Sequence, residues 1–129
     1  MILDTSVLIA LLRREPDCAR YERVLGAGSP VVASSATLVE TAIVAEGKGG
    51  PAAGVELDAL LRDLGVQIIP FTAEHAALAR EGWRRFGKGR HKAGLNFGDC
   101  FAYALARARN EPLLFKGDDF AQTDVKAAI

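Results

Sequence analysis

The sequence predicts an α/β fold with a short parallel sheet of about four to five strands, because short apolar runs alternate with helical patterns along the chain. The length of 129 residues falls within the usual size of one domain. Half of the residues are hydrophobic, which is enough to form a buried core. We therefore expect a single domain over residues 1–129, with helices on both faces of the sheet.

Each expected element is bounded by residues that commonly begin or end a strand or a helix. The expected strands are Met1–Leu3, Pro30–Ala33, Val66–Pro70 and Pro112–Phe115. The expected helices begin near Ser6, at Asp17, after Ser34 and Ser35, at Val55, after Thr72 and after Asn96. We expect a break between two helices at Gly47–Pro51 and a glycine-rich basic loop at Gly87–Leu95.

Charge and cysteine content exclude some classes of protein. Sixteen basic and sixteen acidic residues cancel, so the net charge indicates no partner. Cys18 and Cys100 lack the short spacing of a zinc site or a disulfide framework, and this suits a reducing cytosol. No basic segment precedes an apolar one at the start, and the longest apolar run, Val7–Leu12, is too short to span a bilayer. We therefore expect a cytoplasmic protein with no membrane partner.

Acidic residues follow the first and the last expected strands: Asp4 comes after one, and the pair Asp118 and Asp119 after the other. In open parallel sheets, ligands bind at the carboxyl ends of the strands. Glu40 and Asp99 lie on expected helices that could lean over the same edge, and neither has a Lys or Arg within helical reach. We therefore expect these acids to converge on one site.

Carboxylates that converge in this way repel each other unless a cation or protons intervene. Oxygen ligands of this kind favour Mg²⁺, with Mn²⁺ as the alternative, and such a site can promote the hydrolysis of phosphodiester bonds. Each acid also has an ordinary alternative. Asp4 can cap a helix, Glu40 can face solvent, Asp99 can complement a helix dipole, and the last pair can belong to a turn.

Four motifs, taken together, resemble the PIN-domain nucleases, and among them the VapC toxins of bacterial toxin–antitoxin operons. They are Asp4-Thr5-Ser6, Glu40, Asn96-Phe97-Gly98-Asp99 and Lys116-Gly117-Asp118-Asp119-Phe120, in the order that the family has them. The resemblance covers nearly the whole chain. It implies a metal-dependent endoribonuclease that acts on RNA, is usually a homodimer, and is held inactive by a VapB-like antitoxin.

The resemblance also implies a role for each residue of the site. Asp4 and Asp99 would bind the metal directly, and Glu40 would hold water beside it or act as a base. Ser6, with Thr5 as the alternative, would form hydrogen bonds within the site.

The remaining parts of the resemblance concern the last helix and the end of the chain. Asn96 would orient the helix that carries the third acid. Asp119 matches one family pattern and Asp118 a neighbouring variant, so the fourth acid stays open between them. The sequence ends soon afterwards, at Ile129, so any further edge strand would be very short.

Basic residues gather between positions 84 and 92, where no acid occurs. This stretch directly precedes the Asn96 motif, so we expect it to lie beside the site and to neutralise RNA phosphates. A solvated surface loop is the alternative. The expected substrate-binding residues are Arg84, Arg85, Lys88, Arg90 and Lys92.

Two other functions remain open at this stage. A phosphohydrolase could form an aspartyl-phosphate at Asp4, although Ser6 stands where that class generally has a second aspartate. A binding module for RNA or protein without catalysis is the other alternative. An antitoxin could use an apolar groove in the early helices, although the core is the more common place for such residues; they are Leu8, Leu11, Leu12 and Tyr21.

Overall fold

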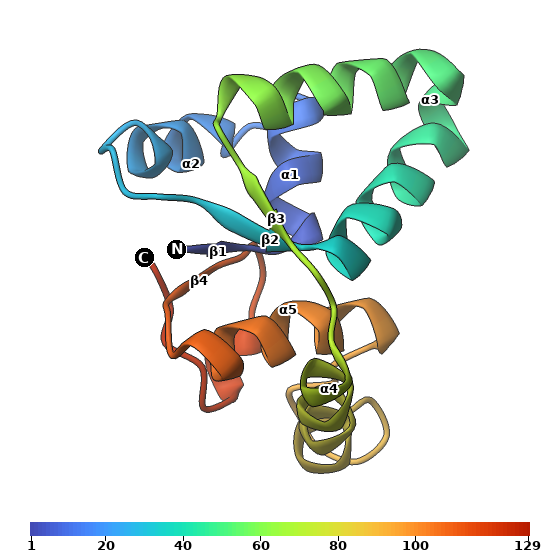
Figure 1. Cartoon of the computed structure of the whole chain (residues 1–129), viewed down its shortest axis with the longest axis vertical. Helices are drawn as coiled ribbons and strands as arrows, with labels where there is room; N and C mark the ends of the chain where they lie inside the picture. The colour runs from blue at the N-terminus through green and yellow to red at the C-terminus, as the bar shows by residue number, and fades with distance from the viewer.

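The computed structural model describes residues 1–129 and places a four-stranded parallel sheet between two groups of helices (Figure 1). The strands are β1 (Ile2–Leu3), β2 (Val32–Ser34), β3 (Gln67–Ile69) and β4 (Leu113–Leu114), in the order β3-β2-β1-β4. The predicted α/β class and parallel sheet are therefore confirmed. Because β1 and β4 are neighbours, their carboxyl ends bring residues from the two ends of the sequence together.

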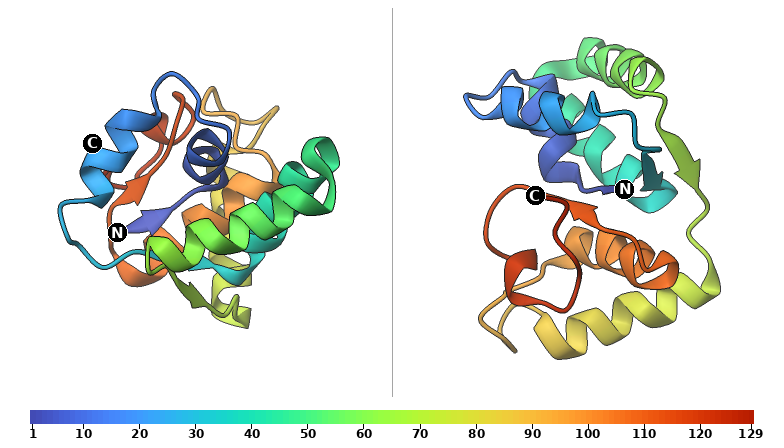
Figure 2. Two further views of the ribbon diagram at one scale, coloured as in Figure 1. Left: turned by 90° about the horizontal axis from the view of Figure 1, so that it is seen from above. Right: turned by 90° about the vertical axis from the view of Figure 1, so that its left-hand side faces the viewer.

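The helices cover the two faces of the sheet unequally. One face carries α1 (Thr5–Leu12), α2 (Cys18–Leu25) and α3 (Ser35–Asp63). The other face carries α4 (Ala73–Phe86) and α5 (Phe97–Arg109), as the second view in Figure 2 makes plain. None of these helices is both long and apolar enough to cross a membrane.

Polar residues at the helix ends set where α1 and α5 begin. The Asp4 carboxylate accepts the Ser6 amide hydrogen and so caps α1 directly after β1. At α5, the Asn96 side chain accepts from the Asp99 amide while the Asp99 carboxylate accepts from the Asn96 amide, which forms a capping box. These caps fix two of the predicted acids at the edge of the sheet.

Helix α3 is bent, and the expected break at Gly47–Pro51 is narrower than the sequence predicts. Only Gly50 leaves the helical conformation, with φ 68° and ψ −169°. Proline disfavours the helical region for the residue before it, and glycine adopts a positive φ at little cost, so Gly50 and Pro51 form the bend together. The first half of α3 carries Glu40, and the second half packs Leu57 and Leu61 into the core.

The core is divided by the sheet into two clusters. One cluster joins α1, α2 and the second half of α3, and the other joins α4 and α5 through residues such as Tyr103 and Leu105. Leu8, Leu11 and Tyr21 lie buried in the first cluster, and Leu12 packs partly buried against it, so these four residues do not form the alternative groove for an antitoxin. Their placement agrees with the interpretation that such apolar residues usually belong to the core.

The end of the chain returns to the edge of the sheet. After the short 3₁₀ helix Phe120–Gln122, Ala127 pairs with Leu113 through a single parallel bridge. The Leu113 amide donates to the Lys126 carbonyl at 2.8 Å, and the Ala128 amide donates to the Leu113 carbonyl at 2.9 Å. The expected last edge strand is therefore present only as one bridge.

Candidate active site

Asp4 lies at the carboxyl end of β1 and is 3% exposed. Its Oδ2 accepts hydrogen bonds from the Ser6 amide at 3.0 Å and from the Ser6 hydroxyl at 2.6 Å. Its Oδ1 is buried and has no hydrogen-bond partner. Burial raises the pKa of Asp4 above its ordinary value, while the bonds from Ser6 oppose that rise and the Glu40 charge adds to it.

Glu40 reaches the same place from the first half of α3. The Thr5 hydroxyl donates to its Oε1 at 2.5 Å and lies 2.9 Å from the Thr41 hydroxyl. Because Thr5 is buried, these bonds hold the Glu40 carboxylate in one position near Asp4. Gly98 at the start of α5 makes room for it, since a Cβ on Gly98 would collide with the Glu40 carboxylate.

Asp99 completes the group from the first turn of α5. Its pKa is raised to about 7, chiefly by burial, and the charges of Asp4, Asp119 and Glu40 add to the rise. The amide of Asn96 opposes it. The structure therefore brings together Asp4, Glu40 and Asp99 from three different elements, as the sequence predicts.

These acids line an open polar hollow of about 400 Å³ at the carboxyl edge of the sheet. Its lining combines the predicted residues with two charged residues, Glu15 and Lys116, for which the sequence predicted no role. The lining residues are Asp4, Thr5, Ser6, Ile9, Glu15, Glu40, Val44, Asn96, Asp99 and Lys116.

The hollow fits a divalent cation by the chemistry of its oxygen atoms, although no three of its acids already stand as a closed set of ligands. Asp4 offers a buried oxygen without a partner, and burial, with a smaller contribution from the neighbouring acids, raises the pKa of Asp99 to about 7. Mg²⁺ commonly uses only one or two carboxylates and keeps several waters. Two carboxylates therefore satisfy what this ion requires of a protein.

The pair Asp118 and Asp119 lies outside the lining of the hollow, and both residues are exposed. The charge of Asp119 contributes to the raised pKa of Asp99. The Asp118 side chain forms no hydrogen bond, and only its carbonyl accepts one, from Gln122. The geometry thus relates Asp119 more closely than Asp118 to the other acids.

The basic stretch from position 84 to 92 does not line the hollow. Arg85 pairs with Glu81 and Asp124, and Arg90 stacks over the Trp83 ring at 4.7 Å. Backbone hydrogen bonds close the loop, since the Lys88 amide donates to the Leu95 carbonyl at 2.9 Å. The five residues Arg84, Arg85, Lys88, Arg90 and Lys92 are all exposed, so contact with RNA remains open to them.

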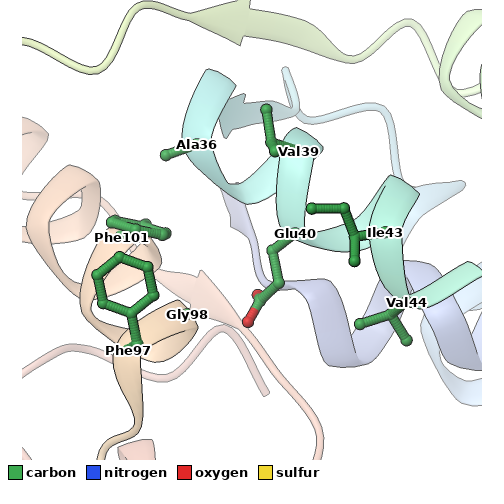
Figure 3. Close-up of a pocket in the computed structure, with 8 residues that line it drawn as sticks. All are labelled: Ala36, Val39, Glu40, Ile43, Val44, Phe97, Gly98 and Phe101. Atoms are coloured by element: carbon green, nitrogen blue, oxygen red, sulfur yellow. The ribbon is translucent and has the colours of Figure 1, made fainter. Parts of the chain in front are cut away.

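A second, apolar hollow of about 380 Å³ adjoins the first and shares Glu40 and Val44 with it. Figure 3 shows the α3 side chains on one side and the rings of Phe97 and Phe101 on the other, with the Glu40 carboxylate between them. Phe97 is 80% exposed and Ile43 is 68% exposed, which is unusual for apolar side chains that lie together. This surface could not be predicted from the sequence, because it forms only where α3 meets α5.

Lys116 and Glu15 are the charged lining residues that sequence reasoning missed. Lys116 lies two residues after β4, and its amide donates to the Ser6 hydroxyl at 2.9 Å. Its ammonium bonds to Glu15 and, at 3.1 Å, to Asp17. The position of Lys116 after a strand was the available signal, because the carboxyl end of β4 lies beside that of β1.

The fold and the acidic site define a class of metal-dependent nuclease, and comparison with known proteins identifies it. A family model described as "PIN domain" matches residues 1–126. Ribonuclease VapC30 of Mycobacterium tuberculosis is 46% identical over 97% of this chain and 95% of its own length. Ribonuclease VapC of Mycolicibacterium smegmatis is 47% identical over 98% of each. The chain therefore belongs to the PIN-domain family, in its branch of VapC ribonucleases.

Solved structures agree on the fold. The crystal structure of Mycobacterium tuberculosis VapC20, described as a Sarcin-Ricin loop cleaving toxin, has a TM-score of 0.78 at 22% identity and covers 96% of this chain and 95% of its own. VapBC2 from Rickettsia felis, bound to a DNA fragment from its promoter, gives a TM-score of 0.76 at 19% identity, with coverage of 98% and 94%. VapC ribonucleases with the PIN fold generally depend on a divalent metal ion.

Proposed function

We propose that this VapC ribonuclease hydrolyses RNA phosphodiester bonds in the polar hollow, as the toxin of a toxin–antitoxin pair, and that Mg²⁺ is its metal, with Mn²⁺ as the alternative. The observation that carries the proposal is the convergence of Asp4, Glu40 and Asp99 on one hollow with a buried oxygen left unpaired. A single domain of residues 1–129 would supply the whole site and would act in the cytoplasm.

Each residue has a separate task in this proposal. Asp4 and Asp99 would hold the metal, which neutralises the acids and offsets negative charge on the phosphate when bound. Glu40, held by Thr5 through its Oε1, has its other oxygen free to accept a proton from the attacking water. Ser6 would keep Asp4 in place, because its hydroxyl and its amide both donate to Oδ2.

The remaining residues would support the site from outside. Asn96 would fix the first turn of α5 through its capping box with Asp99. Asp119 is our choice for the fourth acid, in preference to Asp118, because its charge acts on Asp99. Arg84, Arg85, Lys88, Arg90 and Lys92 would attract RNA over a longer range, since they are exposed but do not line the hollow.

Two partners besides RNA belong to the proposal. A VapB-like antitoxin would bind the chain and block the site; VapBC2 from Rickettsia felis and a toxin–antitoxin complex from Klebsiella pneumoniae have similar folds and support this proposal. A second copy of the chain would form a homodimer. The exposed apolar surface of Val39, Ile43 and Phe97 supports this pairing, because a monomer rarely exposes such side chains together.

Cleavage of total cellular RNA by the purified chain tests the central proposal. We expect fragments with Mg²⁺ and none with a chelator, and we expect the double variant Asp4→Asn with Asp99→Asn to be inactive. The double variant Asp58→Asn with Asp63→Asn is the matched control, because it changes the same charges on exposed residues of α3. Mapping the fragment ends would identify the sequence that is cut. Equal activity of the two double variants would contradict the proposal.

The two alternative functions make different predictions in the same experiment. An aspartyl-phosphate phosphohydrolase would accumulate phosphate on Asp4 and leave RNA intact, and Ser6 rather than a second aspartate stands beside Asp4. A binding module without catalysis would bind RNA but produce no fragments, and Mg²⁺ would leave its thermal stability unchanged.

A further inference from the structure

Lys116 is the only Lys or Arg among the residues that line the polar hollow. Four acids, Asp4, Glu15, Glu40 and Asp99, share that lining. An RNA phosphate that approaches this surface meets strong repulsion unless positive charge is present nearby. The basic stretch at positions 84 to 92 lies outside the lining, so the chain itself supplies positive charge to the hollow through one side chain.

The main chain of Lys116 is held in a fixed relation to Asp4. The Lys116 amide donates to the Ser6 hydroxyl at 2.9 Å, and that hydroxyl donates to Asp4 Oδ2 at 2.6 Å. The backbone amide of Asp4 also donates to the Leu114 carbonyl at 3.1 Å, across the pair of strands β1 and β4. Two short connections thus fix the point from which the Lys116 side chain extends.

Glu15 and Asp17 hold the ammonium group at the rim of the hollow. Its Nζ bonds to a carboxylate oxygen of each, in the loop between α1 and α2. Its ion pairs are with Glu15 and Asp17, and none joins it to Asp4 or Asp99. Glu15 and Asp17 therefore keep the ammonium beside the polar hollow rather than inside it.

The ion pairs of Lys116 with Glu15 and Asp17 are weak enough for another anion to replace these acids. The Lys116 side chain is 37% exposed, and its partners are exposed to similar extents, at 30% and 36%. Ion pairs in contact with water contribute little to stability, because solvent screens them. A phosphate oxygen beside the rim can therefore share or take over the ammonium.

We propose that Lys116 is a substrate-binding residue whose ammonium contacts the phosphate that enters the polar hollow, and that Glu15 and Asp17 hold it ready for that contact. This inference rests on the proposed cleavage of RNA at the same site and assigns one specific phosphate contact to it. A purely structural role, in which Lys116 only ties the loop between α1 and α2 to the end of β4, is the competing explanation.

The two explanations predict opposite effects for two sets of variants. Lys116→Met removes the ammonium, whereas the double variant Glu15→Gln with Asp17→Asn breaks the same ion pairs but leaves the ammonium free. If Lys116 binds phosphate, the first change weakens RNA binding and the second leaves it equal or tighter. If Lys116 has only the structural role, both changes have the same effect on RNA binding. Lys48→Met is the matched control, since Lys48 is exposed on α3 and lines neither hollow.

Binding is measured by fluorescence anisotropy with a labelled, nuclease-resistant single-stranded RNA of mixed sequence, over a series of salt concentrations, with Mg²⁺ and with chelator. We expect Lys116→Met to weaken binding about tenfold, as the loss of one charged hydrogen bond does. The slope of log affinity against log salt should fall by about 0.7, the value for one phosphate contact on a single strand. Lys48→Met should change affinity by less than about twofold, as a distant charge does.

Equal affinity of Lys116→Met and Lys48→Met would overturn the inference, and so would equal weakening by Lys116→Met and by the Glu15 and Asp17 double variant. Circular dichroism checks that each variant is folded, and Lys116→Gln replaces Lys116→Met if the latter is not. The proposed function fails separately, if the wild-type chain binds the oligonucleotide through Lys116 but cleaves no RNA with Mg²⁺. The two failures are therefore distinguishable.

Discussion

The positions of Asp4 and Asp99 destabilise the folded chain, and such a cost is characteristic of residues that bind a ligand. Asp4 is buried with one oxygen unpaired, and Asp99 has a pKa raised to about 7. A structural acid at a helix start would normally be stabilised by its cap, yet here burial outweighs the cap. The free energy lost at these two residues is what a bound cation would restore.

The raised pKa of Asp99 predicts how the stability of the metal-free chain depends on pH. The folded chain keeps the Asp99 proton until about pH 7, whereas the unfolded chain loses it near the ordinary value of 3.8. The folded state therefore binds more protons in this window, so its stability falls as the pH rises through it. Asp99→Asn should remove this loss and stabilise the metal-free chain by about 1–2 kcal/mol above pH 7, a figure reduced for the water in the open hollow.

Thermal unfolding followed by circular dichroism, at about pH 5 and about pH 8 with chelator present, measures this effect. Asn can still accept the hydrogen bond from the Asn96 amide, so the cap is preserved. Asp58→Asn, on an exposed position of α3, should leave the pH dependence as it is. A pH dependence that is the same in Asp99→Asn as in the wild type would show that the Asp99 charge is not the cause.

The acids of the site could be predicted from the sequence because each combines two local signals. Asp4 follows a strand, and Glu40 and Asp99 have no cation within helical reach. The orientation of the Lys116 side chain could not be predicted in this way. It depends on Glu15 and Asp17, which lie about a hundred positions earlier in the sequence and come near only when β1 and β4 pair.

At the scale of elements, the close approach of α3 and α5 is what gives Glu40 its position. Gly98 lies in the first turn of α5, and its lack of a side chain leaves space for the Glu40 carboxylate. A similar contact joins α4 to α5, where a Cβ on Gly82 would lie 2.5 Å from the Tyr103 ring. The first glycine accommodates a flexible side chain, and the second a rigid ring in the core. Substitution of the two should therefore have different consequences.

Gly98→Ala should reduce RNA cleavage strongly while it leaves the fold stable. The added methyl group displaces only the end of the Glu40 side chain, so the cost to stability is small, but the carboxylate leaves its hydrogen bond with Thr5. We expect a loss of about a hundredfold in kcat, typical of removing a general base, and a change in unfolding free energy of less than about 1 kcal/mol.

Gly47→Ala is the matched control, because a Cβ at Gly47 meets nothing within 4 Å on the same helix as Glu40. That change should preserve activity and raise stability by up to about 1 kcal/mol, since alanine favours the helix. Steady-state kinetics and thermal unfolding measure both effects. Full activity of Gly98→Ala would mean that the position of Glu40 is unimportant for cleavage.

The elements themselves follow closely from local sequence signals, and the differences have tertiary causes. Strand β3 was expected at Val66–Pro70 and occurs at Gln67–Ile69, and the helix expected after Thr72 begins at Ala73. Where a break was expected at Gly47–Pro51, the structure has only a bend at Gly50, because both halves of α3 pack against the core. Helix propensity alone cannot decide this, since the packing of Leu57 and Leu61 supplies the stability.

At the scale of the whole molecule, the apolar hollow lies beside the polar one, so that a protein on the first would border the second. Residues as exposed as Phe97 and Ile43 are costly on a monomer. A second copy that covers this surface would therefore also shape the entrance to the polar hollow. Such a dimer would connect the oligomeric state to the access of RNA.

We predict that the chain is a homodimer in solution and that Ile43→Glu makes it a monomer. A buried charge without a partner at the interface costs several kcal/mol, which is enough to dissociate a dimer. Val55→Glu is the control, because Val55 is also 68% exposed on α3 but lines neither hollow. Size-exclusion chromatography with light scattering measures the mass. A wild-type chain that elutes as a monomer would contradict the prediction.

The division of the core by the sheet has a mechanical consequence. Asp4 and Glu40 are attached to the cluster on one face, and Asp99 to the cluster on the other, so the acids meet along a seam between two halves of the molecule. An ion bound by acids from both halves would link the two halves along that seam. Amide hydrogen exchange in the first turn of α5 should then slow when Mg²⁺ is added, while exchange in the last turn of α2, whose residues line neither hollow, should stay constant.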